Sequence, residues 1–237
     1  MRHNGPGGVM VTRLKNSPGQ SGFFNTSSSA ICMPFKKRLL DVVLSIILLW
    51  LATPAIVVLA VIIIACSGRP AFWSQHRTGL NGKLFRLWKL RTMSNEVNEA
   101  GCLLPDRERL TRVGSIIRAS SLDELPQLWN VLKGEMSLVG PRPLLPEYLE
   151  RYTAVQERRH EVKPGITGWA QINGRNALTW EQKFKMDVWY VDNWSLWLDV
   201  KILLRTALKV IRRDGVTQTG HVSMTEFKGS AVSSPSE

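Results

Sequence analysis

Acidic residues are almost absent from the first 95 positions, where Asp41 is the single acid beside 12 lysines and arginines. The other 142 residues are nearly balanced, with 18 acids and 19 lysines and arginines. Most of the net charge of +12 therefore surrounds an apolar segment that begins at Leu39. This distribution favours an anionic membrane surface over a nucleic-acid groove, although charge by itself does not separate the two.

Cysteine and tyrosine are also scarce. The three cysteines, Cys32, Cys66 and Cys102, are widely spaced and form no CxxC pair, so we expect reduced thiols and no zinc site. Three tyrosines stand against nine tryptophans, and tryptophan favours boundaries that are dry on one side and wet on the other. A length of 237 residues with 44% hydrophobic residues predicts one principal domain with appendages.

Both ends of the chain lack hydrophobic periodicity. Residues 1–34 are rich in Gly, Ser, Asn and Pro, and residues 214–237 are polar, so we expect a flexible tail at each end. The first tail does not have the pattern of a signal peptide, because the apolar run comes too late and no small-residue cleavage site follows it.

The segment from Leu39 to Cys66 is the long apolar run. After Asp41 it continues for about 25 residues without a charge, enough as a helix to cross a hydrocarbon core of about 30 Å. Pro54 lies near its middle and removes a helical hydrogen bond, while Thr53 offers a hydroxyl to a freed carbonyl. Basic residues flank both ends, which predicts that both ends lie in the cytoplasm. We favour a re-entrant helix that bends at Thr53-Pro54 over an ordinary span, which the length also permits.

Two adjacent carboxylates, Asp123 and Glu124, stand between two serines and an apolar run. The spacing Ser121-x-x-Glu124 is that of a capping box and predicts a helix from Leu122 to about Lys133-Gly134. Carboxylates at a helix start, with Arg118 five residues before the first, suit metal-assisted phosphoryl chemistry. The plainer alternative is a capped helix whose acids only complement the helix dipole.

Several cations are candidate anion ligands. Asn81-Gly82 predicts a β-hairpin whose second strand carries Lys89 among other basic residues, and a solvated or lipid-facing cationic strand is the alternative there. Pro141 and Pro143 hold Arg142 in a stiff extended segment, as a phosphate clamp requires, and an incidental surface turn is equally compatible. Arg175 follows an Asn-Gly turn in the loop from Lys163 to Asn176.

The patterns of the C-terminal half predict three helices. They cover Pro146–His160, Thr179–Tyr190 with Thr179 as a cap, and a last helix that begins near Ser195. Basic residues recur every four positions in the last helix, which is typical of an interfacial helix, while an amphipathic helix packed on a core is the alternative. These basic residues are Lys201, Arg205 and Lys209.

These motifs together resemble the bacterial sugar transferases known as monotopic phosphoglycosyl transferases, over roughly residues 34–213. The resemblance rests on Lys-Arg-x-x-Asp before the membrane segment, Phe-x-x-x-Lys-x-Arg-Thr-Met at 85–93, Ser-Leu-Asp-Glu-Leu-Pro-Gln at 121–127, Gly-Pro-Arg-Pro at 140–143 and Pro-Gly-Ile-Thr-Gly-Trp-Ala-Gln-Ile-Asn-Gly-Arg at 164–175. The chain looks like the minimal form of the family, and is most similar to members that start glycan assembly with a bacillosamine-type sugar.

The resemblance implies a mainly helical α+β fold, with a re-entrant membrane helix at 35–67, a β-hairpin, and a small helical catalytic domain at 68–213 that has amphipathic interfacial helices. The implied reaction transfers a sugar 1-phosphate from a UDP-sugar to undecaprenyl phosphate and releases UMP, as the first membrane step of glycan, polysaccharide or glycoprotein assembly. UDP-N,N'-diacetylbacillosamine and a UDP-N-acetylhexosamine are candidate donors. The implied location is the cytoplasmic face of the bacterial inner membrane, on anionic phospholipid, with no nucleic acid bound.

The resemblance also assigns roles to residues. Asp123 would be the nucleophile, and Asp123 and Glu124 would hold Mg²⁺. Phosphate-binding positions match Lys89, Arg118, Arg142 and Arg175, and the helix break matches Thr53-Pro54. Two alternatives from other classes are a non-catalytic membrane scaffold and a nucleic-acid-binding protein.

Overall fold

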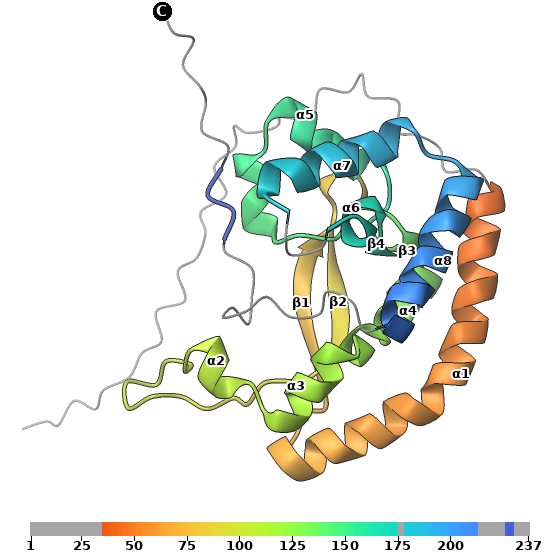
Figure 1. Cartoon of the computed structure of the whole chain (residues 1–237). Coiled ribbons are helices and arrows are strands. Elements are labelled where there is room, and N and C mark those ends of the chain that lie inside the picture. Colours follow the sequence, from red (N-terminus) through yellow and green to blue (C-terminus); the bar gives the residue numbers. More distant parts are fainter. Residues whose placement is uncertain (1–34, 175–177, 213–225, 230–237) are drawn as a thin grey trace, which may run out of the picture.

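The computed structural model describes residues 35–174, 178–212 and 226–229. The fold is a mainly helical α+β arrangement, as expected, with a long N-terminal apolar helix (Figure 1). The α-helices are α1 (Phe35–Ser67), α2 (Asp106–Arg109), α3 (Arg112–Ala119), α4 (Gln127–Lys133), α5 (Ala154–Glu157), α6 (Trp169–Ile172), α7 (Trp180–Asp192) and α8 (Leu196–Arg212). Strands and short 3₁₀ helices are β1 (Phe72–Thr78), η1 (Leu80–Gly82), β2 (Leu84–Leu90), η2 (Leu122–Glu124), β3 (Ser137–Val139), η3 (Pro146–Arg151), η4 (Arg158–Glu161) and β4 (Gly165–Thr167).

Helix α1 bends sharply and encloses the domain on two sides (Figure 1). Pro54 lies inside the helix, and the Thr53 hydroxyl donates to the Leu49 carbonyl oxygen at 2.7 Å. The carbonyl freed by Pro54 is that of Trp50, four residues before it, so this bond does not satisfy the freed carbonyl as we expected. The N-terminal leg lies beside α4 and α8, and the C-terminal leg passes α3.

The basic residues at the start of α1 are used inside the protein. The Lys37 ammonium is 1% exposed and lies 2.5 Å from a carboxylate oxygen of Asp199 on α8. The Arg38 guanidinium donates to the carbonyl oxygens of Val131 and Leu132 at 2.6 and 2.8 Å, at the C-terminal end of α4. From the sequence we interpreted both residues only as charges that flank the apolar segment. In the structure their contacts fix the N-terminal leg of α1 to the domain.

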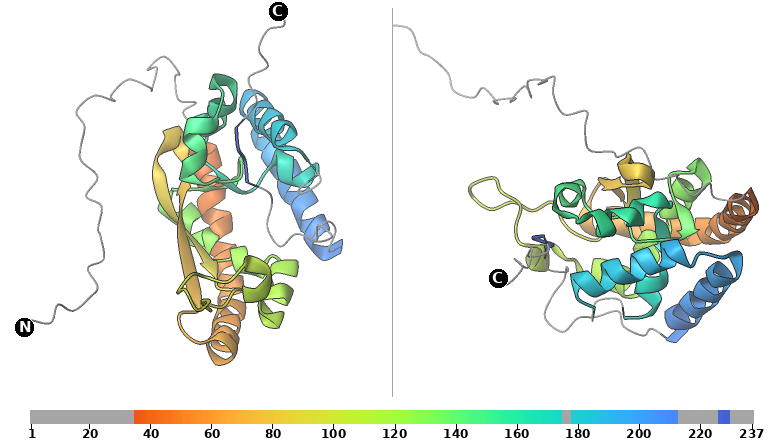
Figure 2. Two further views of the ribbon diagram at one scale, coloured as in Figure 1. Left: turned by 90° about the vertical axis from the view of Figure 1, so that its left-hand side faces the viewer. Right: turned by 90° about the horizontal axis from the view of Figure 1, so that it is seen from above.

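The expected hairpin is present. β1 and β2 pair antiparallel, with Phe72 opposite Leu90 and Thr78 opposite Leu84. Asn81 in the connection has φ of 52°, a left-handed conformation that asparagine tolerates better than most residues. Figure 2 shows the hairpin on one side of the domain and α7 and α8 on the other. The main core lies between these layers and includes Leu87, Val131 and Ile202.

The C-terminal half departs from the expected pattern in two places. The single helix expected over Pro146–His160 is instead η3, α5 and η4, because Tyr152 is extended against an aromatic cluster and Thr153 starts a new helix. The expected loop at 163–176 contains β4, which pairs in parallel with β3, and the short helix α6. Such pairing depends on residues distant in the sequence and leaves no local periodicity.

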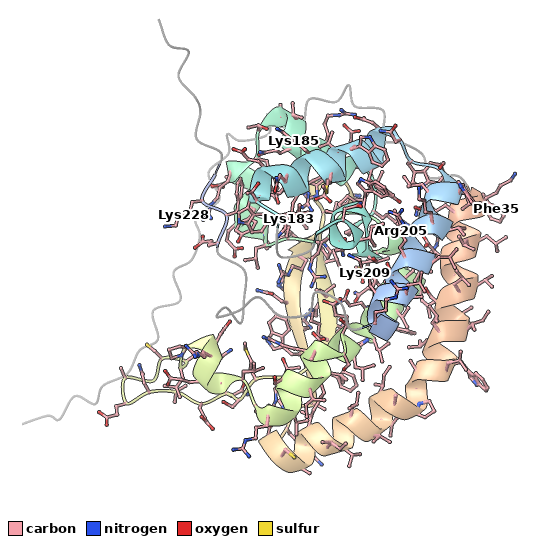
Figure 3. All side chains as sticks on the ribbon, in the orientation of Figure 1. Phe35, Lys183, Lys185, Arg205, Lys209 and Lys228 are labelled. Atoms are coloured by element: carbon pink, nitrogen blue, oxygen red, sulfur yellow. The ribbon has the colours of Figure 1, made fainter. Side chains whose placement is uncertain are left out.

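The last two long helices match expectation closely. Thr179 caps α7 through a capping box with Gln182. Helix α8 has features of both interpretations, because Leu198 and Ile202 are buried in the core while Trp197, Leu204 and Leu208 are exposed. Figure 3 labels Arg205 and Lys209 on α8, and Phe35 at the start of α1.

Candidate active site

Asp123 and Glu124 lie on the 3₁₀ helix η2, between α3 and α4. Ser121 turns the chain into η2 with φ of 59°, and its side chain makes no capping hydrogen bond. The expected capping box is therefore wrong, because an N-cap residue needs an extended backbone and Ser121 is left-handed. The α-helix begins later, at Gln127, and ends at Gly134 as predicted. The tight 3₁₀ turn leaves Asp123 buried and Glu124 half-buried.

Two cations from distant parts of the chain meet the carboxylates. The Lys89 ammonium on β2 lies 2.8 Å from Glu124 Oε1 and 3.4 Å from Asp123 Oδ2. The Arg142 guanidinium, after β3, lies 2.6 Å from the same Glu124 oxygen. Arg142 keeps 48% of its side chain exposed, so it can also meet a ligand from solvent. The structure thus brings together four of the predicted site residues.

The two carboxyl groups differ in their electrostatics. Burial raises the pKa of Asp123, the Lys89 charge opposes this, and the neighbouring Glu124 charge adds to it. Burial also acts to raise the pKa of Glu124, but the Arg142 and Lys89 charges outweigh burial and hold that pKa well below its usual range. Glu124 is therefore a permanently charged anchor for two cations, and Asp123 is the more basic carboxylate.

Arg142 is held by close backbone packing. A side chain added at Gly140 would meet the Lys163 carbonyl oxygen at 2.3 Å, so only glycine allows this approach. The Gly165 amide donates to the Pro141 carbonyl at 2.9 Å. The backbone just before Arg142 is therefore fixed by the segment that follows η4.

The buried Arg159 supports Arg142 from behind. Its guanidinium donates to the Arg142 carbonyl oxygen at 2.7 Å and pairs with Asp187 of α7 at 2.8 Å. The side chains of Arg159 and Asp187 are 2% and 6% exposed. Sequence reasoning missed this pair, since it assigned the two segments only as helices and gave neither residue a role.

Asn130 on α4 performs a similar role for β2. Its side chain is fully buried, accepts from the Trp88 amide at 3.2 Å and donates to the Arg86 carbonyl oxygen at 2.7 Å. These bonds fix the free edge of β2 one residue before Lys89. A lone asparagine within the apolar run 125–132 was the available signal, and it was not used.

Further cations surround Arg142. Burial and the Arg142 charge lower the pKa of Lys183 to about 8 and that of Arg77 to about 10. Charges that disfavour one another in this way create a positive potential, which a polyanionic ligand would relieve. Neither residue was a sequence-based candidate.

The other two predicted phosphate ligands are Arg118 and Arg175. The Arg118 Nε donates to the Thr92 hydroxyl at 2.9 Å, and within residues 35–174 Arg118 forms no ion pair with the carboxylates. Arg175 lies outside the described residues, so its predicted role stays a prediction.

The oxygen donors of the site decide how well it suits Mg²⁺. Among the described residues, no group of three or more His, Cys, Asp or Glu side chains could hold a metal ion. Mg²⁺ at phosphate-transfer sites usually has one or two protein carboxylates, completed by substrate phosphates and water. Asp123 and Glu124 fit that incomplete set, although Lys89 contacts both carboxylates and Arg142 contacts Glu124.

Comparison with known proteins decides the family. The family model described as bacterial sugar transferase matches residues 32–213. The chain belongs to this family. The predicted family and the predicted enzyme class, a phosphoglycosyl transferase, are thereby confirmed.

Three relatives illustrate the range of the family. The uncharacterized sugar transferase EpsL of Bacillus subtilis (strain 168) is 57% identical over 194 residues, which are 82% of this chain and 96% of that protein. The undecaprenyl-phosphate galactose phosphotransferase of Salmonella typhimurium is 43% identical over 76% of this chain and 41% of its own length. The UDP-glucose:undecaprenyl-phosphate glucose-1-phosphate transferase of Caulobacter vibrioides is 41% identical over 78% of this chain and 73% of its own length. The chain thus spans nearly all of one relative and about two fifths of another.

Proposed function

We propose that this enzyme transfers a sugar 1-phosphate from a UDP-sugar to undecaprenyl phosphate and releases UMP. The observation that carries the proposal is the pair of unlike carboxyl groups, with Asp123 basic and buried and Glu124 ionised between Lys89 and Arg142. The names of the Salmonella and Caulobacter relatives support the lipid acceptor, and the Caulobacter name supports a UDP-sugar donor.

Asp123 acts as the nucleophile in a two-step reaction. A carboxylate oxygen attacks the sugar-linked phosphorus, the bond from that phosphorus to the bridging oxygen breaks, and UMP leaves with the bond's electrons. An oxygen of undecaprenyl phosphate then attacks the acyl phosphate, and the Asp123 carboxylate is regenerated. Two negatively charged substrates therefore never need to occupy the site together. Raised basicity makes Asp123 the better nucleophile, provided that it has lost its proton.

The surrounding residues bind and orient the phosphates. Arg142 and Lys89 offer donors to phosphate oxygens, and the positive surroundings that include Lys183 and Arg77 favour the diphosphate. Asp123 and Glu124 would hold Mg²⁺, which when bound offsets phosphate charge and stabilises the departing UMP. Arg118 and Arg175 remain proposed phosphate ligands.

Helix α1 enters the cytoplasmic face of the bacterial inner membrane and returns. Both of its ends contact the same domain, through the Lys37–Asp199 ion pair at one end and Arg91 at the other, whose guanidinium donates to the Ser67, Gly68 and Arg69 carbonyl oxygens. A straight span would carry one end about 30 Å away across the hydrocarbon core. The outer side of the bend is apolar and exposed, and it includes Trp50, Leu51, Val58 and Val61. The exposed apolar residues and basic stripe of α8 would add contact with anionic phospholipid.

The transferred sugar and the pathway are the finer part of the proposal. The names of the Salmonella and Caulobacter relatives include galactose and glucose. We therefore add these two hexoses to the N-acetylated sugars that the sequence suggested as candidate donors. Each would start a membrane-linked glycan, such as an exopolysaccharide or a glycoprotein glycan. A panel of UDP-sugars, scored by UMP release in the presence of undecaprenyl phosphate, identifies the donor.

A burst experiment tests the covalent step. With the donor alone, the enzyme should release one equivalent of UMP and retain phosphosugar label that maps to Asp123. Asp123→Asn should abolish both burst and label, whereas Asp106→Asn, at a half-exposed carboxylate on α2, should leave both intact. UMP release that requires the lipid in the first turnover, with no labelled protein, would instead establish direct displacement in a ternary complex.

A further inference from the structure

An apolar pocket of about 310 Å³ lies between the middle of α1, the hairpin and the start of α4. No charged side chain lines it. Apart from two tryptophan indoles, Thr53 is the one lining residue with a polar side chain. The Thr53 hydroxyl already donates to the Leu49 carbonyl oxygen. The lining residues are Leu49, Thr53, Ile56 and Val57 of α1, Phe72 of β1, Trp88 of β2, and Pro126 and Trp129 at the start of α4.

The pocket exists because the two legs of α1 pack against different cores. Leu44 and Leu49 of the first leg contact the main core, whereas Ile56, Leu59 and Ala60 of the second leg contact a smaller cluster around Ile63 and Leu90. The bend falls between the two cores, and neither fills the space. Much of the apolar rim faces outward, with Val57 56% and Trp129 51% exposed. An apolar surface of this kind needs an apolar occupant.

Two of the segments that line the pocket, β2 and the start of α4, also adjoin the charged site. Trp88 lines the pocket and precedes Lys89, which contacts both carboxylates. Pro126 lines the pocket and follows Glu124 by two residues. Successive strand residues point to opposite faces, so the pocket and the carboxylates lie on the two faces of β2. The start of α4 borders the edge of β2 between them, where Asn130 bonds the Trp88 amide.

We propose that this pocket binds the first isoprene units of the polyprenyl phosphate acceptor, so that its phosphate passes Pro126 to reach Asp123. The inference rests on the proposed function, which supplies a lipid acceptor. A phospholipid acyl chain is the competing occupant. The acceptor fits better because the pocket adjoins a site with cations for one phosphate, while the pocket wall itself offers no charge for a headgroup.

Two neighbouring valines provide a matched test. Val57 and Val58 are 56% and 57% exposed on the same helix, but only Val57 lines the pocket. Val57→Trp should fill the pocket and raise KM for undecaprenyl phosphate by about tenfold or more, because losing the burial of two methylene groups already changes affinity about tenfold. KM for the UDP-sugar should not change. Val58→Trp should behave as wild type in both measurements.

A binding measurement that needs no turnover accompanies the kinetics. A polyprenyl phosphate with a photoreactive diazirine in its first isoprene units should label α1 near Val57 and the start of α4 in the full-length enzyme. Undecaprenyl phosphate should compete for this labelling, and excess phosphatidylglycerol should not. Val57→Trp should reduce the labelling, and Val58→Trp should not.

Several results would overturn the inference. They are equal KM values in the two variants, labelling elsewhere in the protein, or equal competition by phosphatidylglycerol, which would make the pocket a site for bulk lipid. If the wild-type enzyme releases no UMP from any UDP-sugar, the proposed function fails, and the labelling experiment still decides whether the pocket holds a polyprenyl chain.

Discussion

Lys89→Met is the substitution that most directly tests the electrostatics of the site. The Lys89 ammonium lies 3.4 Å from Asp123 and 2.8 Å from Glu124, and its charge is the largest influence that opposes the burial of Asp123. Opposite unit charges at 4 Å attract by about 4 kcal/mol at an effective dielectric constant of about 20. Part of that attraction only offsets the desolvation of the two groups, so the net effect is smaller.

The direction of the effect follows from the role of Asp123. In the proposed mechanism, its carboxylate must be deprotonated to attack phosphorus, so activity should fall as the pH drops through its pKa. Loss of Lys89 removes a charge that lowers this pKa, and the pKa rises further above its ordinary value. The acid limb of the pH–rate profile should therefore move to higher pH by about one to three pH units, the usual effect of one nearby opposite charge.

The assay is the rate of the UMP burst from pH 5 to 9 in wild type and in Lys89→Met. Lys83→Met is the control, because Lys83 is exposed at the other end of the hairpin. Glu124 keeps its contact with Arg142 in the variant, so the carboxylate pair should retain one cation. A lower burst rate with an unmoved acid limb would refute the electrostatic role and leave Lys89 as a phosphate ligand only.

Two further predictions concern the support of the site and its membrane topology. Arg142→Ala should lower kcat/KM by about tenfold to a hundredfold, since a charge-assisted contact contributes about 1.5–3 kcal/mol. Arg159→Met should reduce kcat/KM in the wild-type background. In the Arg142→Ala background the same substitution should cause little further loss. Equal losses in both backgrounds would restrict Arg159 to a role in stability, which thermal unfolding measures separately. Single cysteines at Ser28 and Ser94, in an otherwise cysteine-free protein, should both resist an impermeant thiol reagent added to intact spheroplasts. Labelling of position 28 alone would establish a spanning helix.

Local signals predicted the elements whose boundaries depend on neighbouring residues. The hairpin followed from Asn81-Gly82, the start of α7 from Thr179, and the end of α4 from Gly134, and each is present. The expected cap at Ser121 was wrong, because its backbone is left-handed and an N-cap residue needs an extended one. A capping pattern states what a residue can do and does not fix its backbone angles.

The site could be predicted from sequence only in part. Asp123 and Glu124 are adjacent in the chain, so their pairing was visible directly. Lys89 and Arg142 lie 35 and 18 residues from Glu124, and nothing local indicates that all three meet. The family resemblance grouped them, but their supports, Asn130 and the Arg159–Asp187 pair, carry no motif.

Buried contacts at the two ends of α1 fix this helix to the domain that carries the candidate carboxylates. Breaking a buried ion pair such as Lys37–Asp199 by removing one partner typically costs about 3–5 kcal/mol, so the first leg of α1 is fixed to the domain. Arg91, two residues after Lys89, fixes the second leg through the carbonyl oxygens of Ser67, Gly68 and Arg69. The strand that carries Lys89 therefore leads directly into an anchor of the bend. Because β2 contacts η2, which carries Asp123, and leads into the anchor at Arg91, the bend of α1 and the candidate carboxylates are held by the same part of the domain.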